Sequence, residues 1–424
     1  MKPVNAIVAC CVFLAVTSVA VAADWPQWRG PNRDGVSQEK GLLKEWPAEG
    51  PRLVWQINDA GGGYSTPAVA GDRMYLLGNE GLNDEFVAAR SVADGRQLWT
   101  VRLGKVGNPK QNPPYPGARS TPTVDGDTLY ALGSDGDLVA AKTADGKEVW
   151  RKNLRKDFGG QPGVWAYSES PLVDGGVLVV TPGGAEATVI ALDKKTGRVK
   201  WKSAVPGGDQ AAYSSIIATD VGGKKQYVQF LQKGVVGVDA ATGKFLWRYE
   251  KTAQGSPANI PTPVAKDGFV YSATGKGGGG LIKLAAEGDA VRAEQVYAEA
   301  KLPTAIGGAV LVGEHLYGTS GRGLMCIEFK TGKEVWFDRS VGAGSLLYAD
   351  GMLYVYGENG GETALVQATP EGYVEKGRFA PPNAPPRDQG KTSWAYPVVS
   401  NGKLYLRDWG TVWCFDVRGG GEIN

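Results

Sequence analysis

A repeat of short β-type runs separated by tight-turn residues constrains this chain more than any other feature. The clearest copy lies between Ser120 and Trp150, where four runs of apolar and β-branched residues are separated by Asp-Gly pairs at 125–126, 135–136 and 145–146. Asp and Gly accept the positive φ angles of tight hairpins, so three such pairs in succession predict an up-and-down meander of four strands. One small sheet of this kind cannot bury both of its faces. It therefore has to stack against copies of itself.

Copies of this unit recur along most of the chain. The fifth copy degenerates after Gly277, with an outer strand expected at 294–297, and the seventh ends weakly near Tyr373. The eighth copy stops before its outer strand, but a run of the missing type stands near the other end of the chain, at 51–55. If that run pairs with the last copy, the ring closes through both ends of the chain and leaves no exposed strand edge.

These patterns predict an all-β fold, an eight-bladed β-propeller of four-stranded antiparallel blades closed by the N-terminal strand. The intervals from Trp55 to Trp99 and from Trp99 to Trp150 have the length of a four-strand blade. Seven blades would follow if the fifth or the seventh copy were an insertion.

The first residues have the pattern of a cleaved export signal. Lys2 is followed by an apolar run and then by small residues, so we expect residues 1–23 to be a signal peptide and the protein to be periplasmic or secreted. A retained membrane anchor is one alternative, because the run is just long enough to span a bilayer. Lipidation at Cys10, which follows residues resembling a lipoprotein cleavage box, is another. We expect residues 24–51 to be a Trp/Pro-rich segment packed on the body of the domain and residues 52–424 to be the propeller.

The charge balance excludes some classes of partner. The chain has 46 Lys and Arg against 44 Asp and Glu, a net charge of +2, without a basic cluster. This argues against an electrostatically bound nucleic acid or membrane surface. After signal cleavage we expect no membrane span and a monomer. The mature chain keeps two cysteines, Cys326 and Cys414, which are too few for a disulfide framework and are interpreted as buried small apolar residues.

A motif of fixed spacing closes several copies. It reads Ala191-x-Asp193-x-x-Thr196-Gly197-x-x-x-Trp201 and recurs with one change at 237–247 and two changes at 326–336. It resembles the tryptophan-docking motif of the PQQ-like propeller repeat, which is found in quinoprotein alcohol dehydrogenases and in the outer-membrane assembly factor BamB. The resemblance covers nearly all of the mature chain. It implies that the closing tryptophans pack between neighbouring blades, a structural role for Trp99, Trp150, Trp201, Trp247 and Trp336.

Few residues have the type or spacing of catalytic or metal-binding groups. His315 is the only histidine, so a relay built on another histidine and a multi-histidine metal site are both excluded. The glycine run at 277–280 does not follow a strand and open a helix, as a phosphate-binding loop does, and is interpreted as a hairpin loop. We therefore expect no catalytic residue and no metal site.

The candidate site is formed by the loops that lead into the first, axis-proximal strand of each blade, because these loops meet at the mouth of the central channel. The longest are expected at 104–118, 156–167 and 376–392. A set of aromatic side chains with a few polar groups is typical of a binding pocket, although such residues also pack the ends of blades. The predicted funnel residues are Tyr64, Trp165, Tyr167, Tyr213, Trp394 and Tyr396.

The favoured function is an exported, non-catalytic scaffold that binds a protein or peptide of the cell envelope, as the resemblance to BamB implies. The resemblance to quinoproteins implies an alternative, a dehydrogenase with PQQ and Ca²⁺ in the funnel, for which Arg119, Glu169 and Asn259 are of the right kind. That chemistry also needs a base, which no second inner carboxylate supplies. A carbohydrate-binding propeller is a third hypothesis. Outside the quinoprotein alternative, no cofactor is expected.

Overall fold

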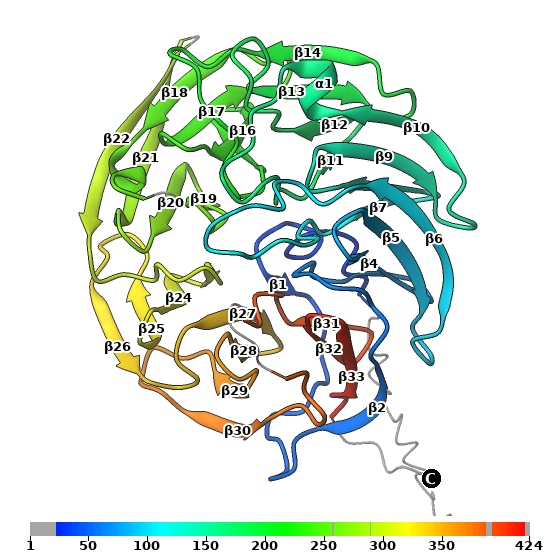
Figure 1. The fold of residues 1–424 in the computed structure, drawn as a ribbon. Helices are drawn as coiled ribbons and strands as arrows, with labels where there is room; N and C mark the ends of the chain where they lie inside the picture. The colour runs from blue at the N-terminus through cyan, green and yellow to red at the C-terminus, as the bar shows by residue number, and fades with distance from the viewer. Residues whose placement is uncertain (1–22, 257, 289, 387–391, 420–424) are drawn as a thin grey trace, which may run out of the picture.

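The chain forms eight β-sheets arranged as the blades of a ring (Figure 1). The computed structural model describes residues 23–256, 258–288, 290–386 and 392–419. Each blade has four antiparallel strands in up-and-down order, so the predicted eight-bladed all-β propeller is confirmed. The predicted signal peptide, anchor and lipidation site lie outside the described residues, apart from residue 23. Helical structure in the described part is limited to α1 (Leu154–Phe158) and one 3-10 turn, η1 (Lys251–Ala253), and no helix there is long and apolar enough to cross a membrane.

The blades follow one another along the chain, each from its inner to its outer strand. Blades 1 to 4 consist of β3 (Ala68–Ala70), β4 (Arg73–Glu80), β5 (Asp84–Ser91), β6 (Gln97–Gly104); β7 (Thr123–Asp125), β8 (Thr128–Leu132), β9 (Asp137–Lys142), β10 (Glu148–Asn153); β11 (Leu172–Asp174), β12 (Val177–Val180), β13 (Val189–Asp193), β14 (Val199–Ser203); and β15 (Ile217–Val221), β16 (Lys224–Phe230), β17 (Val235–Asp239), β18 (Phe245–Tyr249). Blades 5 to 7 consist of β19 (Val264–Lys266), β20 (Phe269–Thr274), β21 (Gly278–Glu287), β22 (Ala290–Glu299); β23 (Ala309–Val312), β24 (His315–Ser320), β25 (Gly323–Glu328), β26 (Glu334–Asp338); and β27 (Gly344–Ala349), β28 (Met352–Gly357), β29 (Thr363–Gln367), β30 (Glu375–Phe379). Blade 8 consists of β31 (Val398–Ser400), β32 (Lys403–Asp408), β33 (Thr411–Asp416) and, from the N-terminal part of the chain, β2 (Arg52–Ile57).

The position of a strand within its blade explains its composition. The middle strands are covered on both faces by the neighbouring blades, so β12 and β13 are almost continuously apolar and buried. The outer strand β14 has one face in solvent and alternates lysine with apolar residues. The predicted weak copies also form blades. The outer strand of blade 5, β22, includes the expected residues 294–297, and the outer strand of blade 7 begins two residues after Tyr373.

The ring closes as predicted. Strand β2 pairs antiparallel with β33, with Leu53 opposite Phe415 and Trp55 opposite Cys414. An ion pair between Arg52 and Asp416 at 2.8 Å lies at the end of the same pairing. Closure therefore uses backbone hydrogen bonds between the two ends of the chain, and the last blade keeps no free edge on β33.

Closing tryptophans connect each blade to the next through a hydrogen bond to a turn. The indole of Trp150 donates to the carbonyl of Lys194 at 3.0 Å, in the turn between β13 and β14 of the following blade. Gly197 in that turn has φ +68°, and a Cβ there would lie 2.9 Å from Trp150 Cδ2. The glycine therefore supplies both the left-handed backbone and the space for the ring. Equivalent bonds run from Trp55 to Val92, Trp99 to Thr143, Trp201 to Ala240 and Trp336 to Thr369.

Three blades depart from this arrangement, and the outer strand of blade 7, β30, contains no tryptophan. In blade 5 a tyrosine takes the place of the tryptophan, since Tyr297 donates to the carbonyl of Phe329 at 2.8 Å and packs on Gly332. Trp247 of blade 4 is buried but turns inward, and its indole donates to Gln226 Oε1 of its own blade at 2.5 Å. Blade 5 lacks the docking turn at this junction, because its β21 and β22 are ten residues each and form a long hairpin instead.

The N-terminal residues 23–37, here called the central segment, occupy the middle of the ring. Figure 1 shows β1 (Val36–Ser37) at the centre, where it pairs in parallel with β27. Hydrogen bonds join the central segment to the inner strand, or to the residues just before it, in every blade except the fourth. The partners are Val69, Val124, Pro171, Thr262, Ala309, Tyr348 and Ser400.

This placement differs from the expected packing on the body of the domain. Arg29 and Arg33 are 2% and 3% exposed and donate to backbone carbonyls in the channel, with Arg33 bonded to Ser170 and Pro171. The inner strands have no further blade on their axial side, so their free carbonyls need donors that guanidinium groups supply. The residues that follow the central segment do pack on the body of the domain, where Trp46 lies against Tyr354 and Phe379.

Candidate functional site

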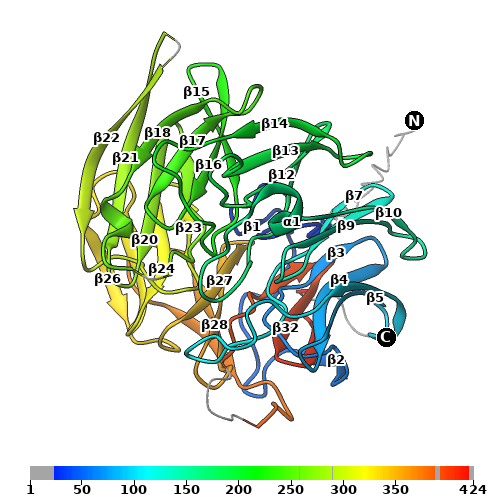
Figure 2. The same ribbon diagram turned by 45° about the horizontal axis from the view of Figure 1, so that its top comes forward.

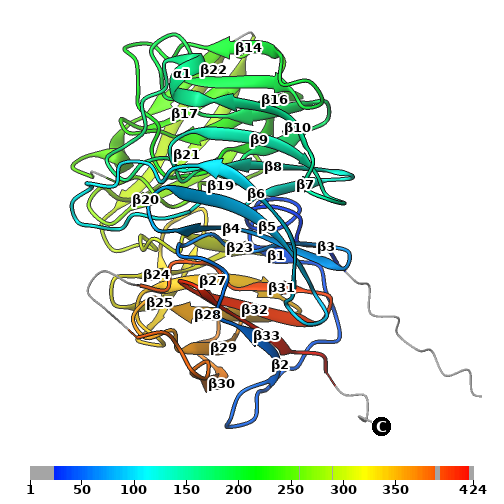
Figure 3. The ribbon, with the colours of Figure 1, turned by 45° about the vertical axis from the view of Figure 1, so that its right-hand side comes forward.

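A pocket of about 330 Å³ opens where the leading loops meet. We call it the funnel pocket. Its walls come from the loops that precede the first strand of each blade except the seventh, and Trp28 comes from the central segment. The loop between β6 and β7, cyan in Figure 1, crosses over the middle of the ring, and Figure 3 shows it projecting from one face. The lining residues are Trp28, Tyr64, Tyr115, Arg119, Trp165, Ser168, Tyr213, Ser215, Ala258, Ile260, Ile306, Trp394 and Tyr396.

Five of the six predicted funnel residues come together in this pocket. Tyr167 does not line it. The Tyr167 ring is 1% exposed, packs in the core shared by blades 2 and 3, and donates its hydroxyl to the carbonyl of Pro182 at 2.9 Å. Because neighbouring residues of an irregular loop point in different directions, its position next to Trp165 in the sequence did not reveal this.

Several lining residues were missed by the sequence prediction. Tyr115 lies in the long loop expected at 104–118, so its presence at the mouth could have been inferred. Ser168 and Ser215 stand near the start of their blades, close to predicted residues. Trp28 had no such signal, because the route of the central segment through the ring is not encoded in a repeat.

Aromatic contacts and hydrogen bonds hold the pocket walls in place. The ring of Trp394 lies 5.0 Å from that of Tyr64 and 4.8 Å from that of Tyr115. On another wall, the ring of Trp165 lies 5.7 Å from that of Tyr213, and the backbone N–H of Trp165 donates to the Tyr213 hydroxyl at 3.1 Å. Such aromatic pairs contribute roughly 0.5–1.5 kcal/mol each beyond burial. Burial also raises the pKa of Tyr64 to about 12, so its hydroxyl stays neutral near pH 7.

Arg119 is the charged residue of the lining. Its Nη2 donates to Gln111 Oε1 at 2.9 Å and also to the carbonyl of Tyr115, and its guanidinium lies 5.5 Å from the centre of the Tyr64 ring. Burial lowers the pKa of Arg119, with Tyr64 the largest influence in the opposite direction. The side chain is thus held on the wall by neutral groups and an aromatic face.

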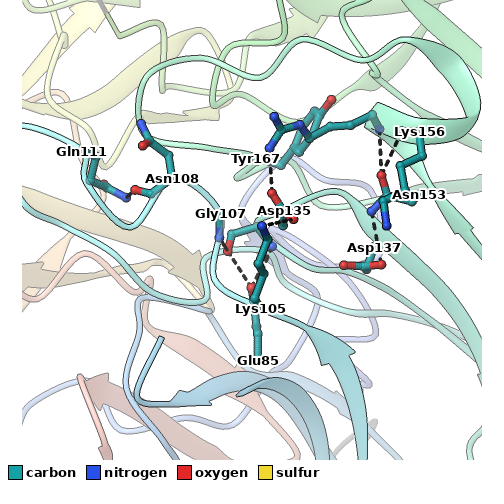
Figure 4. A network of polar contacts seen from close by, with 12 residues as sticks. Glu85, Lys105, Gly107, Asn108, Gln111, Asp135, Asp137, Asn153, Lys156 and Tyr167 are labelled. Atoms are coloured by element: carbon teal, nitrogen blue, oxygen red, sulfur yellow. Dashed lines mark hydrogen bonds and ion pairs between the residues drawn. The ribbon is translucent and has the colours of Figure 1, made fainter. Parts of the chain in front are cut away.

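A polar network beside the pocket fixes the loop that carries Gln111 and Tyr115 (Figure 4). Glu85 is fully buried, and its carboxylate accepts hydrogen bonds from the backbone N–H and the hydroxyl of Ser134. The Ser134 hydroxyl in turn accepts the N–H of Gly107 at 2.9 Å, at the start of the loop. Burial raises the pKa of Glu85 to about 7. The start of the loop is therefore anchored to blade 1 through Glu85 and to blade 2 through Ser134.

Helix α1 anchors the second long loop. Asn153 caps its first turn, since the side-chain oxygen accepts the N–H groups of Arg155 and Lys156. Its amide also donates to Asp137 at 3.2 Å, as Figure 4 shows. Leu154 and Phe158 pack into the core of blades 2 and 3, and Figure 2 shows α1 beside those blades. The loop that follows then delivers Trp165 to the pocket.

The three residues proposed for a PQQ and calcium site lie at different depths. Arg119 lines the pocket, whereas Glu169 and Asn259 are buried in the interior, and the Asn259 Oδ1 has no hydrogen-bond partner in the described residues. Glu169 accepts from the backbone N–H of Thr181 at 2.7 Å and from its hydroxyl at 3.0 Å. Asn259 donates to the carbonyls of Leu231 and Gln232. Calcium needs several oxygen ligands that are free to face it, and the described residues contain no cluster of three or more His, Cys, Asp or Glu with metal-site geometry.

Comparison with known proteins gives a family and a set of similar folds. A family model described as outer membrane protein assembly factor BamB matches residues 83–338. A curated relative, outer membrane protein assembly factor BamB of Nitrosomonas eutropha, is 26% identical over 197 residues, which are 46% of this chain and 40% of that protein. The chain thus spans about two fifths of the length of that relative.

Solved structures show similar folds at low sequence identity. BamB from Moraxella catarrhalis has a TM-score of 0.61 and 14% identity, covering 88% of this chain and 99% of the other. The quinohemoprotein alcohol dehydrogenase from Comamonas testosteroni has a TM-score of 0.52 and 14% identity, covering 95% of this chain and 81% of the other. At this identity the likeness concerns the propeller fold alone.

Proposed function

Because the chain belongs to the PQQ-like β-propeller family of the outer membrane protein assembly factor BamB, we propose that it is an exported, non-catalytic scaffold that binds a protein or peptide in the cell envelope. The funnel pocket is the proposed binding site. The observation that carries this proposal is the convergence of aromatic side chains from five leading loops and the central segment on one pocket. Aromatic side chains bury a large area at low entropic cost and are enriched where proteins bind one another.

The rigidity of the pocket supports a binding role. Its walls are fixed by ring contacts and by hydrogen bonds such as the one from Tyr396 to the carbonyl of Ile306 at 2.9 Å. The indole of Trp28 donates to Thr262 at 2.9 Å, and its ring lies 4.5 Å from that of Tyr396. A site that is ordered before binding loses less conformational entropy when a partner binds.

A pull-down from an envelope extract tests this function. The wild-type protein is expected to retain a specific partner, and Trp165→Ala and Trp394→Ala variants are expected to lose it. A matched control is Trp201→Ala, which removes a tryptophan between blades rather than at the funnel. Circular dichroism should verify that each variant is folded. Equal retention by the funnel variants and the wild type would place the binding site elsewhere, and retention of no partner would contradict a scaffold function.

The quinoprotein alternative makes a different prediction. It requires that PQQ with Ca²⁺ bind the folded protein, and a ligand that binds the folded form must raise its melting temperature. The hydrogen bonds that the Glu169 carboxylate already accepts from Thr181 support the scaffold over this alternative. A thermal shift with PQQ that depends on Ca²⁺ would reverse that preference.

A carbohydrate-binding role uses the same aromatic walls. It predicts that soluble oligosaccharides release the partner retained in the pull-down. Release by peptides but not by oligosaccharides supports the proposed scaffold.

A further inference from the structure

One positively charged side chain lines the funnel pocket. Arg119 is the one charged residue among those lining the pocket, and within the described residues it forms no ion pair. Its Nη2 donates hydrogen bonds to the neutral acceptors of Gln111 and Tyr115. Its Nε is buried and has no hydrogen-bond partner in the described part of the chain. Buried charges in folded proteins are normally paired, because an uncompensated charge in a low-dielectric site is costly. An anion bound in the pocket could therefore pair with this charge.

A second guanidinium, that of Arg29, lies next to a residue that lines the pocket. Arg29 lies 5.9 Å from the centre of the Tyr396 ring, and Tyr396 lines the pocket. It donates to the carbonyls of Asp34 and Ala309, and its Nε and Nη1 have no partner in the described chain.

The acidic groups nearby compensate these cations only partly. Asp34 is the carboxylate that interacts with Arg29, and burial raises the pKa of Asp34. Burial likewise raises the pKa of Glu85, the acidic group nearest Arg119, to about 7. Each of these carboxylates is held by its own hydrogen bonds, to Val36 and to Ser134 respectively.

The shape and the other walls of the pocket restrict what can carry this anion. Its volume of about 330 Å³ lies at the small end of ligand sites, which suits one ring with a short substituent. Tyr64, Trp165 and Trp394 supply aromatic rings to the lining, against which such a ring can pack. Ser168 and Ser215 add neutral hydroxyl groups to the lining.

We propose that the funnel pocket binds an aromatic carboxylate, with the carboxylate on Arg119 and the ring among the aromatic walls. This inference rests on the proposed function and names the ligand chemistry of the same site. The pairing uses a charge-assisted hydrogen bond from the Arg119 guanidinium, which is stronger than a bond between neutral groups. The group can come from two sources, a free aromatic acid or the C-terminal residue of a partner chain that ends in an aromatic side chain.

Calorimetric titration of the full mature protein tests the proposal. The probes are N-acetylphenylalanine, its amide, and a six-residue peptide ending in phenylalanine with a free or an amidated C-terminus. The free carboxylates are expected to bind roughly 10- to 100-fold more tightly than the matching amides, since bonds to charged groups contribute that much. This comparison uses the wild-type protein alone, so it does not depend on any variant folding.

Variants of Arg119 test whether this residue causes the preference for the free carboxylate. Arg119→Gln should remove the preference for the free acid, and Arg119→Lys should keep part of it because the charge remains without the planar fork. Arg96→Gln, at an exposed arginine in the turn between β5 and β6, is the control and should bind as the wild type does.

The outcomes distinguish a free aromatic acid from a chain terminus. They also distinguish failure of this proposal from failure of the proposed scaffold function. Equal affinity of N-acetylphenylalanine and the peptide acid points to a free aromatic acid, and tighter binding of the peptide points to a chain terminus. Equal binding of acids and amides, absence of binding by every probe, or an unchanged preference in Arg119→Gln would overturn the proposal. A pull-down partner that is still lost in Trp165→Ala would then leave the scaffold function standing.

Discussion

Replacing Glu169 with glutamine is expected to remove a large part of the pH dependence of stability of this protein. The carboxyl of Glu169 is 2% exposed and lies between blades 3 and 4, where it accepts two hydrogen bonds from Thr181 and is 3.4 Å from Gln229 Nε2. Burial raises the pKa of Glu169 from 4.5 to about 8, and Arg33 is the nearest charge that opposes this shift. Glutamine has nearly the same shape as the protonated acid and still accepts the backbone N–H of Thr181.

The direction of the effect follows from proton binding. Between pH 4.5 and about 8 the folded protein holds a proton on Glu169 that the unfolded chain has released. The free energy of unfolding therefore falls as pH rises through this window, and the stabilisation from the protonated form is complete only below pH 4.5. A shift of this size corresponds to about 4 kcal/mol between pH 4 and pH 8, at about 1.36 kcal/mol per pH unit. Glu85, with a pKa of about 7, acts in the same direction over a narrower range.

The measurement is urea unfolding of the wild type and Glu169→Gln at several pH values from 4 to 8. The variant is expected to gain about 4 kcal/mol relative to the wild type across this range. Glu334→Gln, at an exposed position of β26, is the control and should follow the wild-type curve. Parallel curves for Glu169→Gln and the wild type would refute the argument, because they would show that Glu169 has the same pKa in the folded and unfolded chain.

Three further predictions concern the blades. Trp55→Ala should lower the free energy of unfolding by about 3–5 kcal/mol in urea titrations, because it removes a buried ring and the closing contact. Gly197→Ala should lower it by about 1–3 kcal/mol, because a Cβ would collide with Trp150 at a left-handed φ. Burial raises the pKa of Cys326 to about 11 and that of Cys414 to about 12, so in a chain starting at residue 24 both should resist a thiol reagent at pH 8 until urea unfolds the protein.

Matched controls separate these causes. Val149→Ala on β10 changes an exposed side chain and should stay within about 0.5 kcal/mol of the wild type. Gly175→Ala places a Cβ in open space at φ +56°, so it measures the backbone strain without the collision expected at Gly197. Equal losses at the two glycines would mean that contact with Trp150 has no energetic effect.

The repeat made the ring predictable from sequence. Turn residues and alternating apolar residues are local properties, and they recur in each blade, so the number of blades and the closing role of Leu53–Trp55 followed from counting copies. The exceptions at Tyr297 and Trp247 were harder to predict from the sequence. A tyrosine can replace the docking tryptophan because its hydroxyl reaches the same carbonyl, but no motif spacing indicates where the indole of Trp247 turns.

The funnel was predictable only in outline. The sequence located the leading loops, and the ring brings loops from distant residues to one mouth, so aromatic residues in them were good candidates. The direction of each side chain depends on loop anchors such as Glu85 with Ser134 and Asn153 with Asp137. These contacts join residues far apart in the chain. For this reason Tyr167 was placed in the funnel and Trp28 was not.

The route of the central segment has a consequence for the order of folding. Residues 23–37 precede every blade in the sequence, yet their binding partners are spread from Val69 in blade 1 to Ser400 in blade 8. The segment cannot reach its final position until almost the whole ring exists, and contacts over such long sequence separations form slowly. Docking of Arg29 and Arg33 should therefore be among the last events of folding, so that residues at the start of the chain complete a structure that the end of the chain has already closed.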